Sequence, residues 1–240
     1  MLRYLRTRLQ QGMHTAEISD GPAPGMPERF RGRPVLDRSR CGADCPAQNG
    51  LDLGRCLFAP EDAAVCPHGA IQFTPDHRMA VRTRDDLRSS HGELRLADAL
   101  DRESRRLFGR SLRLRSVAAG SCGGCEAELV ALGNVVFDLA RFGVQFVASP
   151  RHADGLVLTG AVSINMREAL YRTWLAIPEP RLVIAVGACA ISGGPFRGSP
   201  EVLNGMPADI PVDLYVPGCP PHPLTIMDGL LRLLGQLASR

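Results

Sequence analysis

The chain has 240 residues, of which 45% are hydrophobic and 22% are charged, and its formal net charge is +3. This length allows two modest domains, or one domain with a long extension, and the apolar content is sufficient for a buried core. Apolar runs stop short of the roughly 18–20 residues of a membrane-spanning helix. The start, MLRYLRTRLQ, has no continuous apolar stretch after its basic residues, so we expect neither a membrane span nor a secretory signal.

Basic charge is concentrated at the N-terminus. The first 40 residues contain eight Arg and four acidic residues, whereas the two signs balance from residue 112 onward. A basic N-terminus suits a membrane surface or an acidic protein partner. A solvated tail has the same composition, and charge alone does not separate these two interpretations. We expect no nucleic-acid partner.

In chain order, residues 1–34 are expected to form an N-terminal helix and an extended segment. The apolar stripe of the helix is Leu2, Leu5 and Leu9, and Arg residues occupy the opposite face. The stretch GPAPGMPERFRGRP follows, and its Pro and Gly content excludes regular secondary structure.

Two further segments precede the C-terminal half. Residues 35–84 contain four cysteines, several turn formers and a predicted hairpin, AIQF–TPDH–RMAVRT. Residues 85–111 are expected to be a linker, in which 92–108 form an exposed connecting helix. The apolar stripe of this helix consists of Leu96, Leu100 and Leu107.

Residues 112–240 have the pattern of an α/β domain. Five short β-rich runs occur in the order LRLRSVAA, VQFVAS, GLVLTG, RLVIAVG and VDLYVPG. Helical stretches lie among them at 125–141, 163–177 and 223–237. Strands that alternate with helices predict a parallel sheet with helices on both faces.

The eight cysteines form two sets of four, separated by 55 residues between Cys66 and Cys122. Without a secretory signal, cysteines are usually core residues, metal ligands or redox groups. Each member of the second set follows a predicted strand: Cys122 and Cys125 in GSCGGCE, Cys189 in VGACAISGG and Cys219 in PGCPP. Loops at the carboxyl ends of parallel strands converge on one crevice, so we expect these four thiols to meet.

Four converging thiols suit a 4Fe–4S cluster, because each iron of the cubane takes one thiolate. The many glycines in these loops let the backbone approach such a cluster and direct N–H groups at its sulfurs. A structural zinc ion also takes four cysteines, but usually from two C-x-x-C knuckles, and only one is present in this set. Two disulfides are disfavoured in a reducing compartment. Four unconnected core cysteines are the remaining interpretation.

Four motifs of the C-terminal half indicate a family. GSCGGCEAE, LTGAV, IAVGACAISGG and VPGCPPHP resemble the cluster-bearing small subunit of energy-converting, membrane-bound nickel–iron hydrogenases of the formate hydrogenlyase type. They also resemble the homologous 20 kDa subunit of respiratory complex I. The resemblance covers residues 112–240. It implies a flavodoxin-like domain that carries one 4Fe–4S cluster on Cys122, Cys125, Cys189 and Cys219.

The first cysteine loop separates the two branches of this family. The complex I subunit has two adjacent cysteines there, whereas Cys122 and Cys125 are separated by two glycines, as in the hydrogenases. The resemblance therefore favours the hydrogenase branch. It also implies that Glu126 lies near the boundary with a large subunit, where it relays protons. The alternative for Glu126 is a helix-start carboxylate that the helix dipole favours.

The N-terminal half resembles another subunit of these complexes, the two-cluster ferredoxin-like subunit, in degenerate form. GRCLFAPEDAAVCPHGAI keeps only Cys56 and Cys66 of its motif, and CGADCP keeps only Cys41 and Cys45. By the ferredoxin ligand pattern, Cys41 pairs with Cys66 and Cys45 with Cys56, which leaves two ligands for each cluster. We therefore predict four vestigial cysteines in a degenerate ferredoxin-like α+β module over residues 35–84. A rearranged cluster or a zinc site would require the fold to move.

The resemblance implies an electron-transfer subunit of an oxidoreductase complex, without catalytic residues of its own. The expected partners are a hydrogenase-like large subunit, membrane-arm subunits and a soluble ferredoxin-type electron carrier. The expected location is peripheral, on the cytoplasmic face of the cell membrane. The alternatives within the family are a complex I-like quinone oxidoreductase and a related complex without hydrogenase activity. Outside it, a flavodoxin-like flavin or nucleotide binder and a non-redox structural subunit are the rival interpretations.

Overall fold

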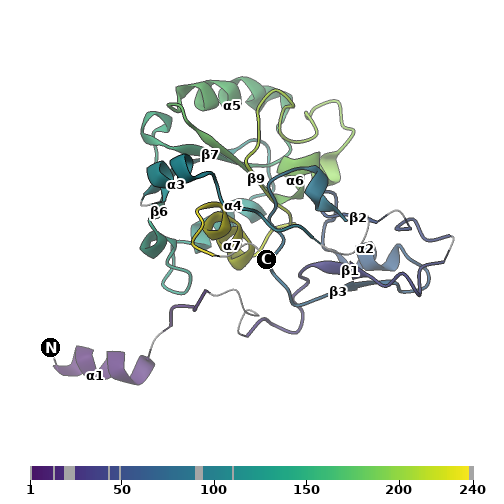
Figure 1. The fold of residues 1–240 in the computed structure, drawn as a ribbon, viewed down its shortest axis with the longest axis horizontal. Helices are drawn as coiled ribbons and strands as arrows, with labels where there is room; N and C mark the ends of the chain where they lie inside the picture. Colours follow the sequence, from purple (N-terminus) through teal and green to yellow (C-terminus); the bar gives the residue numbers. More distant parts are fainter. Residues whose placement is uncertain are drawn as a thin grey trace.

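A five-stranded parallel sheet forms the centre of the C-terminal half of the computed structural model (Figure 1). Its strands are β5 (Leu112–Ala118), β6 (Val144–Phe146), β7 (Gly155–Thr159), β8 (Leu182–Val186) and β9 (Leu214–Val216). The spatial order is β6-β5-β7-β8-β9, and all four pairings are parallel. Numbered within the sheet this is the order 2-1-3-4-5 of flavodoxin-like folds. The predicted parallel sheet and its five strands are confirmed.

The structure describes most of the chain. The described ranges are 2–12, 14–18, 25–42, 44–48, 50–89, 94–109 and 111–237.

Alternating residues of the sheet face two different cores. Every residue of β7 and β8 is buried, because both faces of these central strands are covered. Val157 and Ile184 belong to a core with the helices over 124–131 and 223–233, whereas Leu156 and Val183 belong to a core with the helices over 164–176 and 187–192. Successive side chains of a strand point to opposite faces, and both faces are covered here. The central strands are therefore continuous apolar runs.

The helices of the C-terminal half are α4 (Gly124–Ala131), α5 (Ile164–Ala176), α6 (Gly187–Ser192) and α7 (Pro223–Leu233). Short 3₁₀ turns lie at Leu139–Phe142, Pro150–His152 and Gly194–Phe196. The helices predicted at 163–177 and 223–237 are confirmed, with α7 ending a turn early. The helix predicted over 125–141 is wrong beyond Ala131. Asn134 stops it, because its side-chain oxygen accepts the backbone N–H groups of Val136 and Phe137 and fixes a turn.

The N-terminal part contains two small antiparallel sheets instead of the predicted hairpin over 70–83. β1 (Pro34–Leu36) pairs with β3 (Ile71–Phe73), and β2 (Leu51–Asp52) pairs with β4 (Arg88–Ser89). The helix α2 (Pro60–Ala64) and a 3₁₀ turn at Asp85–Leu87 complete this part.

The residues after β3 join the main sheet, which is why the hairpin does not form. Val81 forms a bridge with Tyr215 of β9, and Met79, Ala80 and Val81 are at most 2% exposed. Burying an apolar run of this kind in the large core stabilises the protein more than pairing it as the exposed second strand of a hairpin.

The connecting helix predicted over 92–108 is limited to α3 (Arg102–Phe108). Asp101 caps this helix by accepting the N–H groups of Glu103 and Ser104. Residues 94–100 form no helix: the N–H of Ala97 donates to Ala80, and that of Leu100 donates to Leu233. Leu100 is therefore buried in the core, against the prediction of an exposed helix. The first residues of the predicted helix, 92 and 93, lie outside the described ranges.

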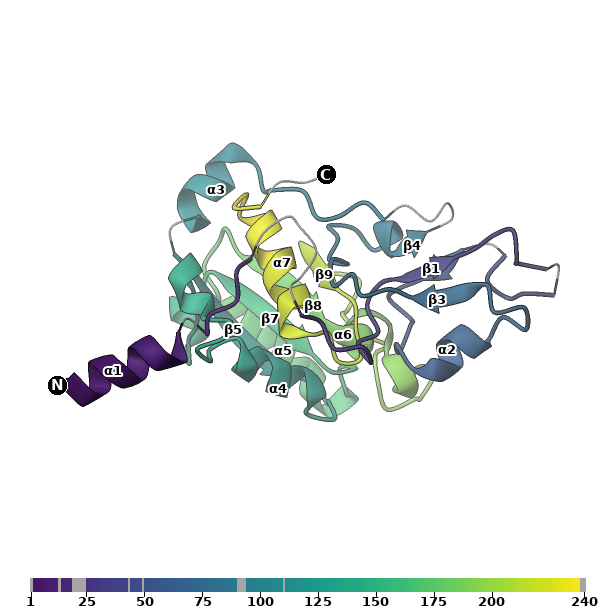
Figure 2. The ribbon, with the colours of Figure 1, turned by 90° about the horizontal axis from the view of Figure 1, so that it is seen from below.

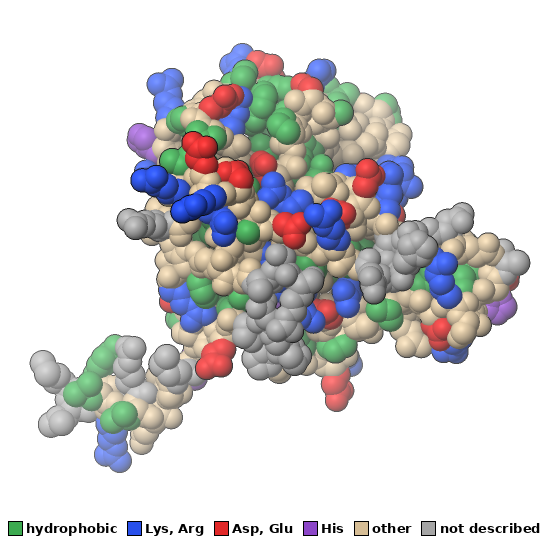
Figure 3. All heavy atoms as spheres, viewed as in Figure 1, with side chains coloured by type: hydrophobic (Ala, Val, Ile, Leu, Met, Phe, Trp, Pro, Cys, Tyr) green, Lys and Arg blue, Asp and Glu red, His purple; other side chains and the backbone are tan. Residues whose placement is uncertain are grey.

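The N-terminal helix α1 (Leu2–Gln11) is confirmed and extends away from the rest of the molecule (Figures 1 and 2). Its side chains Leu5 and Leu9 are 51% and 84% exposed, and hydrophobic side chains on it are uncovered in Figure 3. The following residues are attached to the main body, because the N–H of Ala16 donates to the carbonyl of Val136. Residues 19–24, where the predicted Pro- and Gly-rich segment begins, lie outside the described ranges. No described helix has the length and apolarity required to cross a membrane.

A buried ion pair lies within α7. Asp228 and Arg232 are one helical turn apart, their side chains are each 2% exposed, and Nε of Arg232 lies 2.9 Å from Oδ2 of Asp228. Removing one member of such a pair takes a hydrogen-bonded partner away from a charge buried in the core, which is costly. The chain also has an exposed pair of the same spacing, Glu168 and Arg172, with 72% and 78% exposed side chains.

We expect Asp228→Ala to lower the free energy of unfolding by about 3–5 kcal/mol. Glu168→Ala is the matched control, and we expect its effect to stay within about 0.5 kcal/mol because water screens the exposed pair. Guanidinium unfolding followed by circular dichroism under anaerobic conditions measures both. Equal effects of the two substitutions would show that burial of the ion pair does not determine its contribution.

Candidate functional site

Three loops that carry cysteines meet at the carboxyl edge of the sheet. Cys122 follows β5, Cys125 lies in the first turn of α4, Cys189 lies in the first turns of α6 after β8, and Cys219 follows β9. The β8 and β9 loops are joined directly, because the N–H of Ala188 donates to the carbonyl of Gly218 over 2.8 Å.

Glycine permits the closest approach between these loops. Gly187 has a φ of +90°, and a Cβ atom at this position would lie 2.5 Å from Sγ of Cys125. Gly194 has a φ of +52°, and its Cβ would lie 2.7 Å from Sγ of Cys189. A side chain at either position would therefore occupy space beside a sulfur atom, as well as strain the backbone. The contact at Gly187 brings the loop after β5 against the loop after β8. The contact at Gly194 brings Sγ of Cys189 against the glycine turn that follows α6.

The four thiols are close enough to affect one another's ionisation. Burial raises the pKa of Cys125 to about 12, and Glu126 and the other three thiols add to the effect. Burial also raises the pKa of Cys189 to about 11, with contributions from Cys219 and Cys122. Four thiolates at this edge would repel one another, so a bound metal group has to supply compensating positive charge. The donor set therefore fits a metal centre with thiolate ligands.

The spacing of these thiols differs from that of a site for a single ion. Among the described residues, the one group of three or more ligand atoms that all lie within 4.8 Å of each other is elsewhere in the chain. Each thiolate of a cubane cluster binds a different iron, so its ligands lie farther apart than those of one ion. The looser arrangement of the C-terminal four is consistent with a multi-iron cluster.

The N-terminal part of the chain covers one side of this edge. The hydroxyl of Ser192, at the end of α6, donates to the carbonyl of Gly54 over 2.7 Å. Sγ of Cys56 lies 3.5 Å from Oδ2 of Asp62. Burial raises the pKa of Cys219, and the carboxylate of Asp62 contributes to this shift. Sequence patterns gave no sign that Cys56 and Asp62 border the site, because the contact joins parts of the chain more than 150 residues apart.

A small cavity lies beside Cys219 on the same side. It has a volume of about 240 Å³, and its walls include Phe30, Phe58, His222 and Pro220. The ring of His222 packs edge-on against Phe30, with a centroid distance of 5.5 Å. Aromatic and proline side chains therefore line this part of the edge, and Cys219 itself is exposed.

The N-terminal cysteines are arranged differently from the prediction. Sulfur atoms of Cys41, Cys45 and Cys66 form a group in which all distances are within 4.8 Å. Cys41 lies with Cys66 as predicted, but the second predicted pair is wrong, because Cys45 lies with these two thiols and not with Cys56. Cys56 instead contacts Asp62 and borders the C-terminal site. The fold places α2 between Cys56 and Cys66 and so separates these two thiols.

Glu126 is held by two hydroxyl groups in the first turn of α4. Its Oε1 accepts a hydrogen bond from Ser121 at 2.6 Å and another from Thr159 at the end of β7. Burial raises the pKa of Glu126, but the hydrogen bonds from Ser121 and Thr159 outweigh it and leave the pKa below its usual value of 4.5. The second oxygen, Oε2, is buried without a described hydrogen-bond partner.

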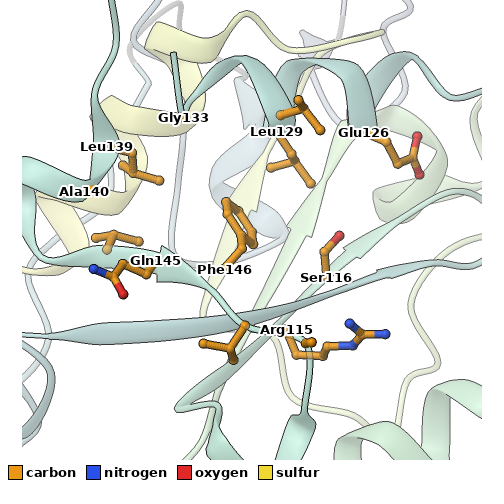
Figure 4. Close-up of a pocket in the computed structure, with 13 residues that line it drawn as sticks. Arg115, Ser116, Glu126, Leu129, Gly133, Leu139, Ala140, Gln145 and Phe146 are labelled. Carbon is orange, nitrogen blue, oxygen red and sulfur yellow. The ribbon is translucent and has the colours of Figure 1, made fainter. Parts of the chain in front are cut away.

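Glu126 also belongs to the wall of an open cavity of about 660 Å³ between α4 and the β5–β6 edge of the sheet. Figure 4 shows Glu126 at one end of this cavity, with Arg115 and Ser116 on the sheet and Leu129 and Phe146 farther along. Phe146 is 38% exposed. The cavity is mostly apolar, and a carboxylate lies at the end nearest to the cysteine loops.

Known proteins match the part of the chain that carries this site. Residues 122–233 match the family model described as NADH ubiquinone oxidoreductase, 20 Kd subunit. The probable membrane-bound hydrogenase subunit mbhJ of Pyrococcus furiosus is 42% identical over 134 residues, which cover 56% of this chain and 80% of that protein. Formate hydrogenlyase subunit 7 of Escherichia coli (strain K12) is 44% identical over 131 residues, or 55% of this chain and 51% of the relative.

The complex I branch matches about as well. An NADH-quinone oxidoreductase subunit of Roseiflexus sp. (strain RS-1) is 48% identical over 117 residues, which cover 48% of this chain and 44% of that protein. The chain thus spans about half the length of the formate hydrogenlyase and quinone oxidoreductase relatives that it matches. Identity alone does not choose between the two branches.

Two neighbouring carboxyl groups of α4 should respond to acid in opposite directions. The pKa of Glu126 is lowered in the fold, so its ionised form stabilises the protein above pH 4.5, and this contribution is lost as the pH falls through the lowered pKa. Burial raises the pKa of Glu128, so its ionised form destabilises the protein, and this penalty disappears as the pH falls below 4.5. We expect acidification to destabilise the wild type relative to Glu126→Gln and to stabilise it relative to Glu128→Gln.

Guanidinium unfolding at a series of pH values between about 3.5 and 7 measures both differences, and each variant controls for the other. Parallel profiles for the two variants would contradict the opposite environments of these carboxyl groups.

Proposed function

Because the chain belongs to the family of the 20 kDa subunit of NADH ubiquinone oxidoreductase, we propose that it is an electron-transfer subunit that holds one 4Fe–4S cluster. The ligands are Cys122, Cys125, Cys189 and Cys219. The observation that carries this proposal is the meeting of three cysteine loops at one edge of a parallel sheet, with Gly187 packed against Sγ of Cys125.

A 4Fe–4S cluster, when bound, takes up and releases one electron at a time. The chain itself supplies the four thiolates, the burial and the neighbouring charges that set the potential. Half-buried Cys125 and Cys189 hold the inner side of the site, and exposed Cys122 and Cys219 lie on its outer side. We assign no catalytic residue to this chain, so its contribution to the reaction is conduction.

We infer that a large subunit covers the exposed thiols, because Cys122 and Cys219 are exposed to solvent at the carboxyl edge of the sheet. The same partner would close the cavity that Glu126 borders, where Val130 and Phe146 are exposed. A carboxylate with a buried, unpartnered oxygen at such a boundary is suited to relaying protons. We assign this role to Glu126.

The partner is a hydrogenase-like large subunit in our proposal, because two glycines separate Cys122 from Cys125. The alternative partner is the corresponding subunit of a complex I-like quinone oxidoreductase, or of a related complex without hydrogenase activity. Nickel-binding cysteine pairs in the large subunit encoded next to this chain would support the first assignment. Their absence would favour the alternative.

We further propose that α1 rests on a membrane-arm subunit at the cytoplasmic face. Support comes from its exposed Leu5 and Leu9 and from the Arg residues of the N-terminus. Residues 35–84 act as a degenerate ferredoxin-like module without iron–sulfur clusters, and residues 85–111 link it to the domain at 112–240. A soluble ferredoxin-type carrier is the proposed electron donor or acceptor.

The ligand assignment is tested by iron analysis of the anaerobically purified chain. We expect about four irons per chain and a matching amount of acid-labile sulfide. Cys189→Ala and Cys219→Ala should each lose the iron, because each removes one of four thiolate ligands. Cys56→Ala is the matched control, a half-buried thiol beside the same edge, and it should retain the iron.

Iron absent from the wild type would contradict the proposal and leave a flavin binder or a structural subunit. Equal loss of iron from Cys189→Ala and Cys56→Ala would show that the ligands are misassigned.

A second test uses the glycine contact. Gly187 and Gly123 both have left-handed backbones, with φ of +90° and +86°. A Cβ at Gly187 would lie 2.5 Å from Sγ of Cys125, whereas a Cβ at Gly123 would have no atom within 4 Å. We therefore expect Gly187→Ala to lower the iron content to a fraction of the wild-type value, and Gly123→Ala to keep most of it. Similar losses in both variants would mean that backbone strain, and not the space beside the sulfur, is responsible.

A further inference from the structure

The second thiol group lies at one end of the small β1–β3 sheet, away from the proposed cluster ligands. It consists of Cys41, Cys45 and Cys66, whose sulfur atoms all lie within 4.8 Å of one another. All three are free thiols in the structure. We propose that this group binds a single zinc ion, with His68 as the fourth ligand.

The distances fit one ion. Four ligands at the usual zinc–sulfur distance of about 2.3 Å form a tetrahedron whose sulfur atoms are about 3.8 Å apart. The 4.8 Å limit of this group is close to that spacing, so a metal ion would require only a small contraction. Cys45 and Cys66 are 3% and 2% exposed, which keeps water from two of the three sulfurs.

The two loops that carry these thiols are held together by backbone pairing. Leu36 of β1 is opposite Ile71 of β3, and the N–H of Asp37 donates to the carbonyl of Ala70 over 2.8 Å. Cys41 follows Leu36 by five residues, and Cys66 precedes Ile71 by five residues. The strand register therefore places the loops opposite each other without any contribution from a bound ion.

His68 lies against the loop between Cys41 and Cys45. Its Nε2 forms a 2.8 Å hydrogen bond with Oδ1 of Asp44, and a Cβ at Gly42 would lie 2.6 Å from the same nitrogen. A carboxylate that accepts from Nε2 leaves Nδ1 as the nitrogen that can ligate a metal, an arrangement common around zinc. The side chain of His68 is 47% exposed, and its ring has to turn toward the thiols to become a ligand, because neither of its nitrogens lies within 4.8 Å of all three sulfurs.

A zinc ion would also account for the stability of this small region. Among the described residues, its core contains five buried residues, which are Cys45, Ala47, Cys66, Ala70 and Ile71, with Leu36, Leu51 and Ala63 partly buried against them. Two alanines and one isoleucine bury little apolar area, and small modules of this kind commonly depend on a metal ion. The sulfurs of Cys45 and Cys66 thus serve both as core side chains and as ligands.

The proposal is tested on the full chain, purified anaerobically from cells grown with added zinc. We expect about one zinc per chain by mass spectrometry, in addition to the iron. The zinc X-ray absorption spectrum should show about three sulfur ligands near 2.3 Å and one nitrogen. His68→Ala should lose the nitrogen contribution, and His152→Ala, an exposed histidine elsewhere, should not.

Three cysteine variants separate the two sites. Cys45→Ala should lose the zinc and keep the iron, Cys189→Ala should lose the iron and keep the zinc, and Cys56→Ala should keep both. The zinc proposal therefore stands or fails independently of the proposed cluster.

Several results would overturn it. One is a wild type without stoichiometric zinc, and another is a disulfide between two of the three thiols after anaerobic purification. Loss of iron from Cys45→Ala would assign the group to an iron centre instead. The absorption spectrum of the wild type decides the ligand set even if a cysteine variant fails to fold.

Discussion

The direction of the strands is the constraint on which the proposed cluster site depends. All strands of the central sheet are parallel, so β5, β8 and β9 end at the same edge, and the loops that follow them carry Cys122, Cys189 and Cys219. An antiparallel β8 or β9 would send its loop to the opposite edge of the sheet. The burial of every residue in β7 and β8 fixes this sheet between two helical layers, which makes its edge a rigid support for the loops.

The N-terminal part of the chain is packed into the same structure and is not a separate appendage. Phe58, Met79 and Val81 share a core with the sheet residues Leu156 and Val183. This packing places α2 and its surroundings against one side of the cysteine loops. Cys122, Cys219 and the cavity beside α4 are left exposed. The chain therefore shields its site on one side by itself and presents the other side to the proposed large subunit.

Two sets of thiols in one chain differ in a way that matches different metal centres. The C-terminal set is spread over three strand ends, and each loop positions its own sulfur atoms. The N-terminal set is compact and is positioned by the register of a single strand pair, β1 and β3. Several irons require the first arrangement and one ion requires the second, because the number of metal atoms determines how far apart the ligands lie. Cys56 belongs to neither set, although the sequence groups it with the N-terminal cysteines.

The sequence by itself determined the parallel sheet, its five strands and the position of each C-terminal cysteine after a strand. These features follow from local patterns: apolar runs that alternate with amphipathic helices, and cysteines at fixed offsets from the strand ends. Only the tertiary structure decided the arrangement of the N-terminal cysteines and the partner of Val81. Those outcomes depend on contacts between distant segments, such as Val81 with Tyr215 and Ser192 with Gly54. Periodicity reports which face of an element is buried, but it carries no information about which distant segment covers that face.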